Sequence, residues 1–254
     1  MILATEIFVL LCVVLLLPQA AALQAESGLV EVVFVLFGKM PSYMHTAVEL
    51  AARLNPVTLI SDTNPAGAGI LGRMHLPEGG GAGAGVKVVH VNGLMTGARD
   101  FEKVYLHLSR DHSAGRKLHE LRCFQRWFIL RDYMRYNTPA GRAGTFFGDG
   151  DTALFANATM AWKASTRRAC DATVATPGTA HAFNWVSTGC SSFWTLPAIE
   201  SFCTFLLETY KENKYMQILR SKAARGSSVV DMSLLWLWFV RALPEAASGF
   251  SAGR

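Results

Sequence analysis

The stretch that decides the fold is LVEVVFVLFGKMPSYMHTAVELAARLNPVTLISD, from Leu29 to Asp62. It opens with a β-rich apolar run that ends at a glycine, residues 29–38. Residues 40–55 follow, with a proline near their start and apolar residues at helical spacing, which predicts a helix. A second apolar run, residues 56–62, ends in an aspartate. A strand–helix–strand unit of this length predicts two parallel strands joined by a crossover helix.

The rest of the chain continues the same pattern. Apolar runs predict a third strand over 86–94 and a fourth that begins at Thr145. Amphipathic patterns predict helices over 118–137, 196–213 and 229–243. We therefore expect an α/β fold with a mostly parallel central sheet flanked by helices, in one domain over residues 28–244.

Two segments are expected to lie outside this framework. Residues 64–85 are rich in glycine and carry GAGILG at 67–72, which matches GxGxxG superficially but opens no periodic helix. We interpret them as a flexible loop rather than as a dinucleotide-binding turn. The last residues, 245–254, are expected to form a disordered tail.

The N-terminus has the pattern of a targeting segment. The apolar run IFVLLCVVLLL at 7–17 is followed by Pro18 and by small residues up to Ala22. This favours a signal peptide over residues 1–22, with an uncleaved signal anchor and a buried helix as alternatives. We expect a protein of the secretory pathway, in the Golgi or ER lumen or secreted, in contact with a membrane only if the segment is an anchor.

Charge and cysteine content narrow the function classes. The chain carries 24 basic and 19 acidic residues, for a net charge of +5. No Lys/Arg cluster with interleaved aromatic residues is present, so nucleic acid is not an expected partner, whereas an anionic small molecule is compatible. Four of the five cysteines, Cys123, Cys170, Cys190 and Cys203, lie outside the N-terminal segment. They are compatible either with two disulfides or with isolated buried thiols.

An acidic pair stands in the fourth apolar run, TFFGDGDTALFANAT, Thr145 to Thr159. Buried carboxylates are costly to desolvate, but the carboxyl ends of strands in open α/β sheets are where ligands bind. Asp149 and Asp151 at that edge would hold Mn²⁺ or Mg²⁺, which prefer oxygen ligands and often share them with phosphates. Gly150 between them would let a ligand approach the backbone. The alternative is an ordinary β-turn, because GDG is common turn chemistry.

Several motifs occur together in one order: VVFVLFGKMPSY, LISD, CFQRWFILRDYM, GDGDTALFAN and VSTGCSSFWTLPAIESFCTFL. Together they resemble a nucleotide-sugar glycosyltransferase of the GT-A fold, a DxD-containing family, over residues 30–235. The resemblance implies a Rossmann-like nucleotide-diphospho-sugar transferase fold and a metal-dependent enzyme. Such an enzyme moves a sugar from a nucleotide-diphosphate donor to a glycan, protein or lipid acceptor.

The resemblance also implies roles for individual residues. Asp149 and Asp151 would hold the metal, with Asp151 the main ligand. The remaining donor-binding residues would be Phe37, Gly38, Lys39, Ser61, Asp62, Arg126 and Gly150. Arg126 would face the donor phosphates or sugar, a task that suits a guanidinium. Its alternative is an exposed helix residue, and Asp62 could instead cap the loop that follows it.

The sequence also offers candidates for a catalytic base and for residues that bind the acceptor. Asp231 could accept the proton of an acceptor hydroxyl, or it could simply be a first-turn residue of the last helix. Asn184, Trp185, Ser191 and Trp194 are candidates for an acceptor-binding wall, since aromatic faces pack on sugars, although both tryptophans also suit a core. Asn157 lies in the sequon NAT, where glycosylation and an unused sequon both stay open.

Two other functions compete with a transferase. One is a catalytically inactive binding protein on a glycosyltransferase scaffold. The other is a haloacid dehalogenase-like phosphatase, because DGDTAL resembles the DxDxT motif whose aspartate forms a phosphoryl intermediate. In this chain Thr152 comes one position early for that motif, and no later acidic pair follows.

Overall fold

A computed structural model describes residues 29–63, 85–109, 111–137, 144–165, 172–175, 188–213, 215–225 and 229–242. The predicted signal segment (1–22) and tail (245–254) lie outside the described residues. So do nearly all of the glycine-rich segment (64–85) and the candidate residues Asn184 and Trp185.

The centre of the fold is a six-stranded sheet in the order β3-β2-β1-β4-β6-β5. β1 (Val30–Leu36), β2 (Val57–Ser61), β3 (Val86–His90) and β4 (Gly144–Gly148) are parallel. β6 (Thr188–Trp194) runs antiparallel to both β4 and β5 (Ala172–Ala175). The α/β class and the mostly parallel sheet are therefore confirmed.

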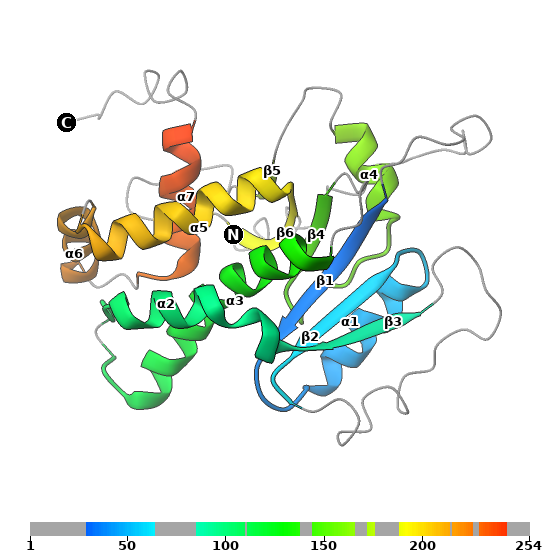
Figure 1. Cartoon of the computed structure of the whole chain (residues 1–254), viewed down its shortest axis with the longest axis horizontal. Coiled ribbons are helices and arrows are strands. Elements are labelled where there is room, and N and C mark those ends of the chain that lie inside the picture. The colour runs from blue at the N-terminus through cyan, green and yellow to red at the C-terminus, as the bar shows by residue number, and fades with distance from the viewer. Residues whose placement is uncertain are drawn as a thin grey trace, which may run out of the picture.

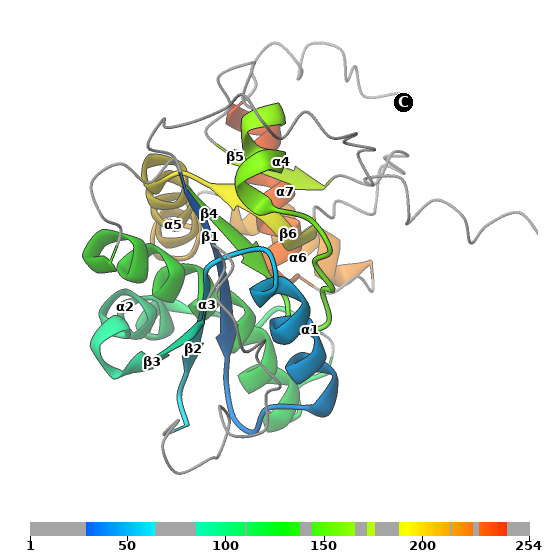
Figure 2. The same cartoon turned by 90° about the vertical axis from the view of Figure 1, so that its right-hand side faces the viewer.

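Helices cover both faces of the sheet (Figures 1 and 2). One face carries α1 (Ser42–Ala52) and α4 (Ala158–Ser165), which pack on apolar side chains of β1, β2 and β4. The other face carries α2 (Thr96–Val104), α3 (Ala114–Asn137) and α5 (Leu196–Lys211), with α6 (Met216–Ala224) and α7 (Asp231–Ala242) against α5. The strands alternate their side chains between the two faces, so each helical layer buries one apolar side of the sheet.

Several elements differ from the sequence prediction at their ends. The third strand stops at His90, whose ring accepts a hydrogen bond from the Asn92 amide, and a 3-10 turn, η2 (Val91–Leu94), follows. The long helix α3 begins four residues earlier than its apolar pattern indicates. The short α2, α4 and α6 have no counterpart in the prediction, because each spans only eight or nine residues.

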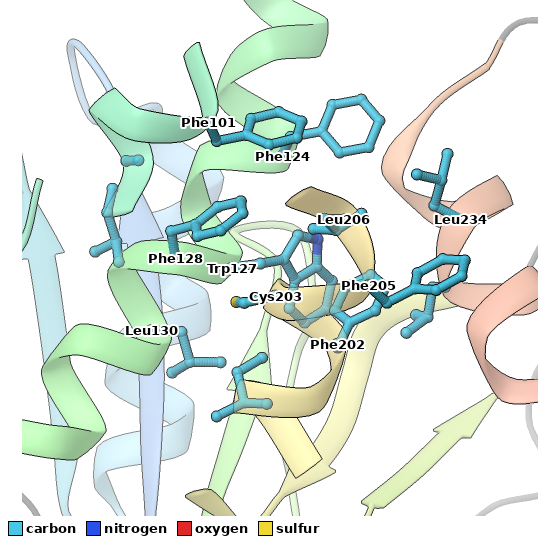
Figure 3. Packing of buried hydrophobic residues seen from close by; sticks show 14 of the residues in the cluster. Phe101, Phe124, Trp127, Phe128, Leu130, Phe202, Cys203, Phe205, Leu206 and Leu234 are labelled. Carbon is cyan, nitrogen blue, oxygen red and sulfur yellow. The ribbon is translucent and has the colours of Figure 1, made fainter. Parts of the chain in front are cut away.

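The larger core lies between the sheet and α3, α5 and α7 (Figure 3). Trp127 packs its ring against Phe147, Trp194 and Phe202 at centroid distances of 4.9, 5.3 and 5.3 Å. Trp194 is fully buried there, and its indole nitrogen donates to Ser192 Oγ at 2.7 Å. The prediction that Trp194 faces an acceptor sugar is therefore wrong, since its ring belongs to the core.

The cysteines that the structure describes carry thiols rather than disulfides. Cys123 on α3 and Cys203 on α5 are both free, which rules out two disulfides among the four cysteines that follow the N-terminal segment. Cys203 lies inside the larger core (Figure 3). Burial raises its pKa well above the ordinary thiol value, so Cys203 serves as a packing residue.

The strand order places a topological switch between β1 and β4. The chain proceeds outward from β1 to β2 and β3, and then returns through α3 to the opposite side of β1. In open α/β sheets a crevice forms outside the carboxyl ends of the strands at such a point. The residues that follow β1 and β4 are those in which the sequence predicts a site.

Candidate functional site

The acidic pair lies in a turn that begins where β4 ends. β4 stops at Gly148, and the Thr152 amide donates to the Asp149 carbonyl at 2.8 Å. The Asp149 side chain is 27% exposed, and Asp151 is exposed. The acidic pair therefore lies in a β-turn and also at the ligand-binding edge of the sheet, so the two interpretations do not exclude each other. At this position the carboxylates are only partly removed from water.

The two glycines around Asp149 have packing reasons. A Cβ atom on Gly148 would lie 2.8 Å from the Phe34 ring on the neighbouring strand. A Cβ atom on Gly150 would lie 3.0 Å from the sulfur of Met44 on α1. Both positions bring the Asp149 backbone close to its neighbours, which a larger side chain would prevent.

Arg126 joins the acidic turn to the last helix. From α3, its Nη1 atom donates to Asp149 Oδ1 and its Nη2 atom donates to Asp231 Oδ2, the latter at 2.9 Å. Trp127 Nε1 donates to the same Asp231 oxygen at 2.9 Å. Three elements that are far apart in the sequence, α3, the β4 end and α7, therefore meet at one guanidinium.

Burial and charge act together in this cluster. Burial disfavours the charge of Arg126, but the carboxylates of Asp231 and Asp149 outweigh it and raise the pKa of Arg126. For Asp149 the balance is different. Its burial, together with the nearby Asp231 and Asp151, raises its pKa above the ordinary value although Arg126 acts to lower it. The cluster is thus an incompletely neutralised group of carboxylates.

A pocket of about 290 Å³ opens beside Arg126. It lies between the end of β1 and the first half of α3, and is lined by Val35, Phe37, Gly115, Leu118, His119, Arg122, Cys123 and Arg126. Two of these residues, Arg122 and Arg126, are cations one helical turn apart. Burial, followed by the charge of Asp231, raises the pKa of Cys123 to about 12, so this thiol stays protonated at neutral pH.

The ends of β1 and β2 are tied together at the rim of this pocket. The Gly38 amide donates to Asp62 Oδ1 at 2.6 Å, and Gly38 has a φ of +80°, which favours glycine. Arg122 lies 3.9 Å from Asp62 Oδ2 and stacks over the Phe37 ring at 5.2 Å from its centroid. Phe37, Gly38 and Asp62 are thus brought together as expected, with Asp62 bound to the β1 end.

Other candidate residues lie in different surroundings. Ser61 is fully buried, and its hydroxyl pairs with Thr63 Oγ1 at 2.9 Å. Lys39 and Ser191 are exposed. Asp231 is the first residue of α7 and only 2% exposed, so its alternative role as a first-turn residue is confirmed.

Asn157, in the sequon, uses its side chain in local structure. Its Oδ1 accepts from the Met160 amide at 2.9 Å, and its Nδ2 donates to the Leu54 carbonyl at 2.9 Å. Asn157 therefore acts as the N-terminal cap of α4.

Two site residues escaped the sequence analysis. Arg122 precedes Arg126 by four positions, and this spacing alone indicates two cations on one helix face. Trp127 could not be identified from the sequence, because its hydrogen-bond partner Asp231 lies 104 residues away.

The residues at the acidic turn are compatible with a hard divalent cation. Within the described ranges, no group of three or more His, Cys, Asp and Glu side chains is placed to hold a metal. Asp149 and Asp151 therefore provide at most two protein ligands. That number suits Mg²⁺ or Mn²⁺, which usually complete their shells with waters and substrate phosphates.

Comparisons with known proteins identify no family for this chain. No protein-family model matches the chain, and no curated protein matches it in sequence. In the part of the chain that the structure describes, no helix is long and apolar enough to cross a membrane. One solved structure with some similarity is the PaToxG glycosyltransferase, at 9% identity and a TM-score of 0.46. The alignment covers 86% of this chain and 72% of that one, and a similarity of this size indicates neither family nor activity.

Proposed function

We propose that the protein is a metal-assisted glycosyltransferase that uses a nucleoside-diphosphate sugar. The observation that carries this proposal is the position of the acidic turn. Asp149 and Asp151 lie at the carboxyl end of β4, at the topological switch, and Arg126, which contacts Asp149, also lines a pocket at the end of β1. A cation-lined pocket beside a carboxylate pair suits a substrate whose diphosphate is bound by the arginines and by a divalent cation on the carboxylates.

Arginines would position the donor in this pocket. Arg122 and Arg126 both line it, and guanidinium groups bind phosphate oxygens with two parallel hydrogen bonds. Phe37 also lines the pocket, and its ring holds the Arg122 guanidinium beside it. Asp62 keeps the β1 end in place through the Gly38 amide.

Asp151 and Asp149 would hold the divalent cation. When bound, such a cation neutralises the negative charge that develops on the departing nucleoside diphosphate. The reaction would break the bond from the anomeric carbon to the phosphate oxygen and form a bond from that carbon to the acceptor oxygen. The hydroxyl proton would pass to the departing diphosphate or to water. Positioning and fixed charges provide most of the acceleration in such a site.

Asp231 has a supporting role in this proposal. Its carboxylate is nearly inaccessible and accepts bonds from Arg126 and Trp127, which suits a positioning residue better than a general base. The acceptor remains a glycan, a protein or a lipid. Ser191 is exposed on β6, beside β4, and is a candidate residue for the acceptor side of the site. The proposed compartment is the secretory pathway.

The test is release of nucleoside diphosphate from a panel of nucleoside-diphosphate sugars with Mn²⁺, using the full chain. Asp151→Ala is expected to reduce turnover at least about 100-fold, because it removes charge stabilisation at the reacting centre. Asp149→Ala should have a large effect as well. The matched control is Asp100→Ala. Asp100 is an exposed aspartate on α2 and forms an ion pair with the exposed Lys103. Equal turnover in all three variants would exclude this site.

Other outcomes correspond to the competing functions. Binding of nucleoside diphosphates without turnover of any sugar would identify an inactive binding protein. A phosphatase of the haloacid dehalogenase type would form a phosphoryl intermediate on Asp149. The early position of Thr152 in that motif and the lack of a later acidic pair in the sequence favour the transferase.

A further inference from the structure

We propose that Arg126 is a built-in cation that competes with a divalent metal ion for the Asp149 carboxylate. The inference rests on the proposed function, because it concerns how the metal enters that same site. It goes beyond that function because it assigns control of metal binding to a single residue, Arg126.

The contacts of Arg126 are those of a counter-ion. Its guanidinium bonds to Asp149 Oδ1 and, on its other nitrogen, to Asp231 Oδ2. A metal at Asp149 would place two like charges within a few ångströms of each other, and their repulsion is weakly screened where water is partly excluded. Arg126 is only 16% exposed, so this condition is met.

Arg126 is also held where it is. Asp231 is fixed by the Trp127 indole and by its place at the start of α7. The guanidinium carbon lies 5.7 Å from the Trp127 ring centroid and 5.5 Å from that of Phe147. Such contacts favour the cation in this position, so moving Arg126 away to admit a metal costs free energy.

Asp151 differs from its neighbour. It is exposed and forms no ion pair with any residue that the structure describes. The protein without substrate is therefore expected to bind a metal through Asp151, with Asp149 withheld.

The pocket provides a way to release Asp149. Arg126 Nε is buried and has no hydrogen-bond partner among the described residues, and Arg126 lines the pocket. An anion in the pocket would lie beside the guanidinium and so share the charge of Arg126. Metal and diphosphate would then bind with positive coupling.

The experiment measures Mn²⁺ affinity of the full chain by electron paramagnetic resonance of free Mn²⁺, without nucleotide. Arg126→Gln is expected to bind Mn²⁺ at least about tenfold more tightly than the parent, because it frees Asp149 and removes a nearby positive charge. Adding Asp149→Asn should remove most of this gain, because only the part due to the lost positive charge remains. Non-additivity of this kind identifies a direct coupling between the two residues.

The matched control is Arg122→Gln, which removes the same charge from the same helix and pocket but makes no contact with Asp149. Its Mn²⁺ affinity should change less than about threefold. The proposal is overturned if Arg126→Gln binds no more tightly than Arg122→Gln, or if most of its gain survives Asp149→Asn.

Should Arg126→Gln fail to fold, Arg126→Met provides the same test. Methionine keeps an apolar stem of similar length but removes the charge and the bonds to both carboxylates. Tighter Mn²⁺ binding than in the parent supports competition, and unchanged affinity contradicts it. Turnover is not a readout here, so absence of sugar transfer would refute the proposed function and leave this inference standing.

Discussion

Replacement of Asp231 by alanine should destabilise the protein far more than loss of an ordinary aspartate. Asp231 Oδ2 accepts from Arg126 Nη2 and from Trp127 Nε1, both at 2.9 Å. Alanine leaves the indole N–H without its acceptor, inside a fully buried ring. An unsatisfied buried donor costs about 1–3 kcal/mol.

The loss of charge adds to this cost. Arg126 would keep Asp149 but lose its second carboxylate, and removing one partner of a buried ion pair costs about 3–5 kcal/mol. Loss of an acidic residue from the first turn of α7 costs a further ~0.5 kcal/mol. Since the terms overlap, we expect the free energy of unfolding to fall by about 3–5 kcal/mol in total.

Urea unfolding, followed by tryptophan fluorescence and circular dichroism, measures this change. Asp231→Asn keeps an oxygen that both donors can use, so it should lose about half as much stability as Asp231→Ala. Asp100→Ala is the control, because its exposed pair with Lys103 contributes at most about 1 kcal/mol. A loss below 1 kcal/mol in Asp231→Ala would refute the reasoning, and an Asn variant as unstable as the Ala variant would show that hydrogen bonding is not its basis.

Three further predictions concern the same part of the molecule. The raised pKa of Asp149 means that ionisation opposes folding, so Asp149→Asn should be more stable than the parent near neutral pH, and urea titrations should show this advantage shrinking as the pH falls through the raised pKa. Gly148→Ala should cost about 1–3 kcal/mol, because the new methyl group would meet the Phe34 ring at 2.8 Å, and Phe34→Leu should recover part of that loss in the double variant. Asn55→Ala should cost about 2–4 kcal/mol in urea unfolding, because this buried amide makes three hydrogen bonds that join α1 to the segment after the acidic turn. Asn157→Ala, which removes an exposed cap, should cost about 1 kcal/mol, and equal losses in the two asparagine variants would contradict the role given to burial.

The parts of the fold that the sequence predicts are those with strong local patterns. The strand–helix–strand opening, the long α3 and the position of the acidic pair follow from apolar periodicity and turn residues, which act over a few positions. Local patterns of this kind do not predict the surroundings of Trp194. Its strand pairs with β4, and whether the ring faces the core or a ligand depends on which helix covers that side of the sheet.

The charge network of the site could not be predicted for a related reason. Arg126 and Asp231 are 105 positions apart, and the packing of α7 against α3, α5 and β6 brings them together. The sequence offers each of them a role toward substrate. Their contact with each other appears only after the chain has folded, and it changes the expected chemistry of both.

That contact also decides how the acidic turn should respond to ligands. With Arg126 in place, Asp149 is partly neutralised and Asp151 is left as the exposed carboxylate of the turn. Under the proposed function, a metal ion alone would gain little from such an arrangement, whereas a metal together with a diphosphate would satisfy the arginine and the carboxylates at once. The site would then bind the two ions together better than either separately, because each would remove the charge that opposes the other.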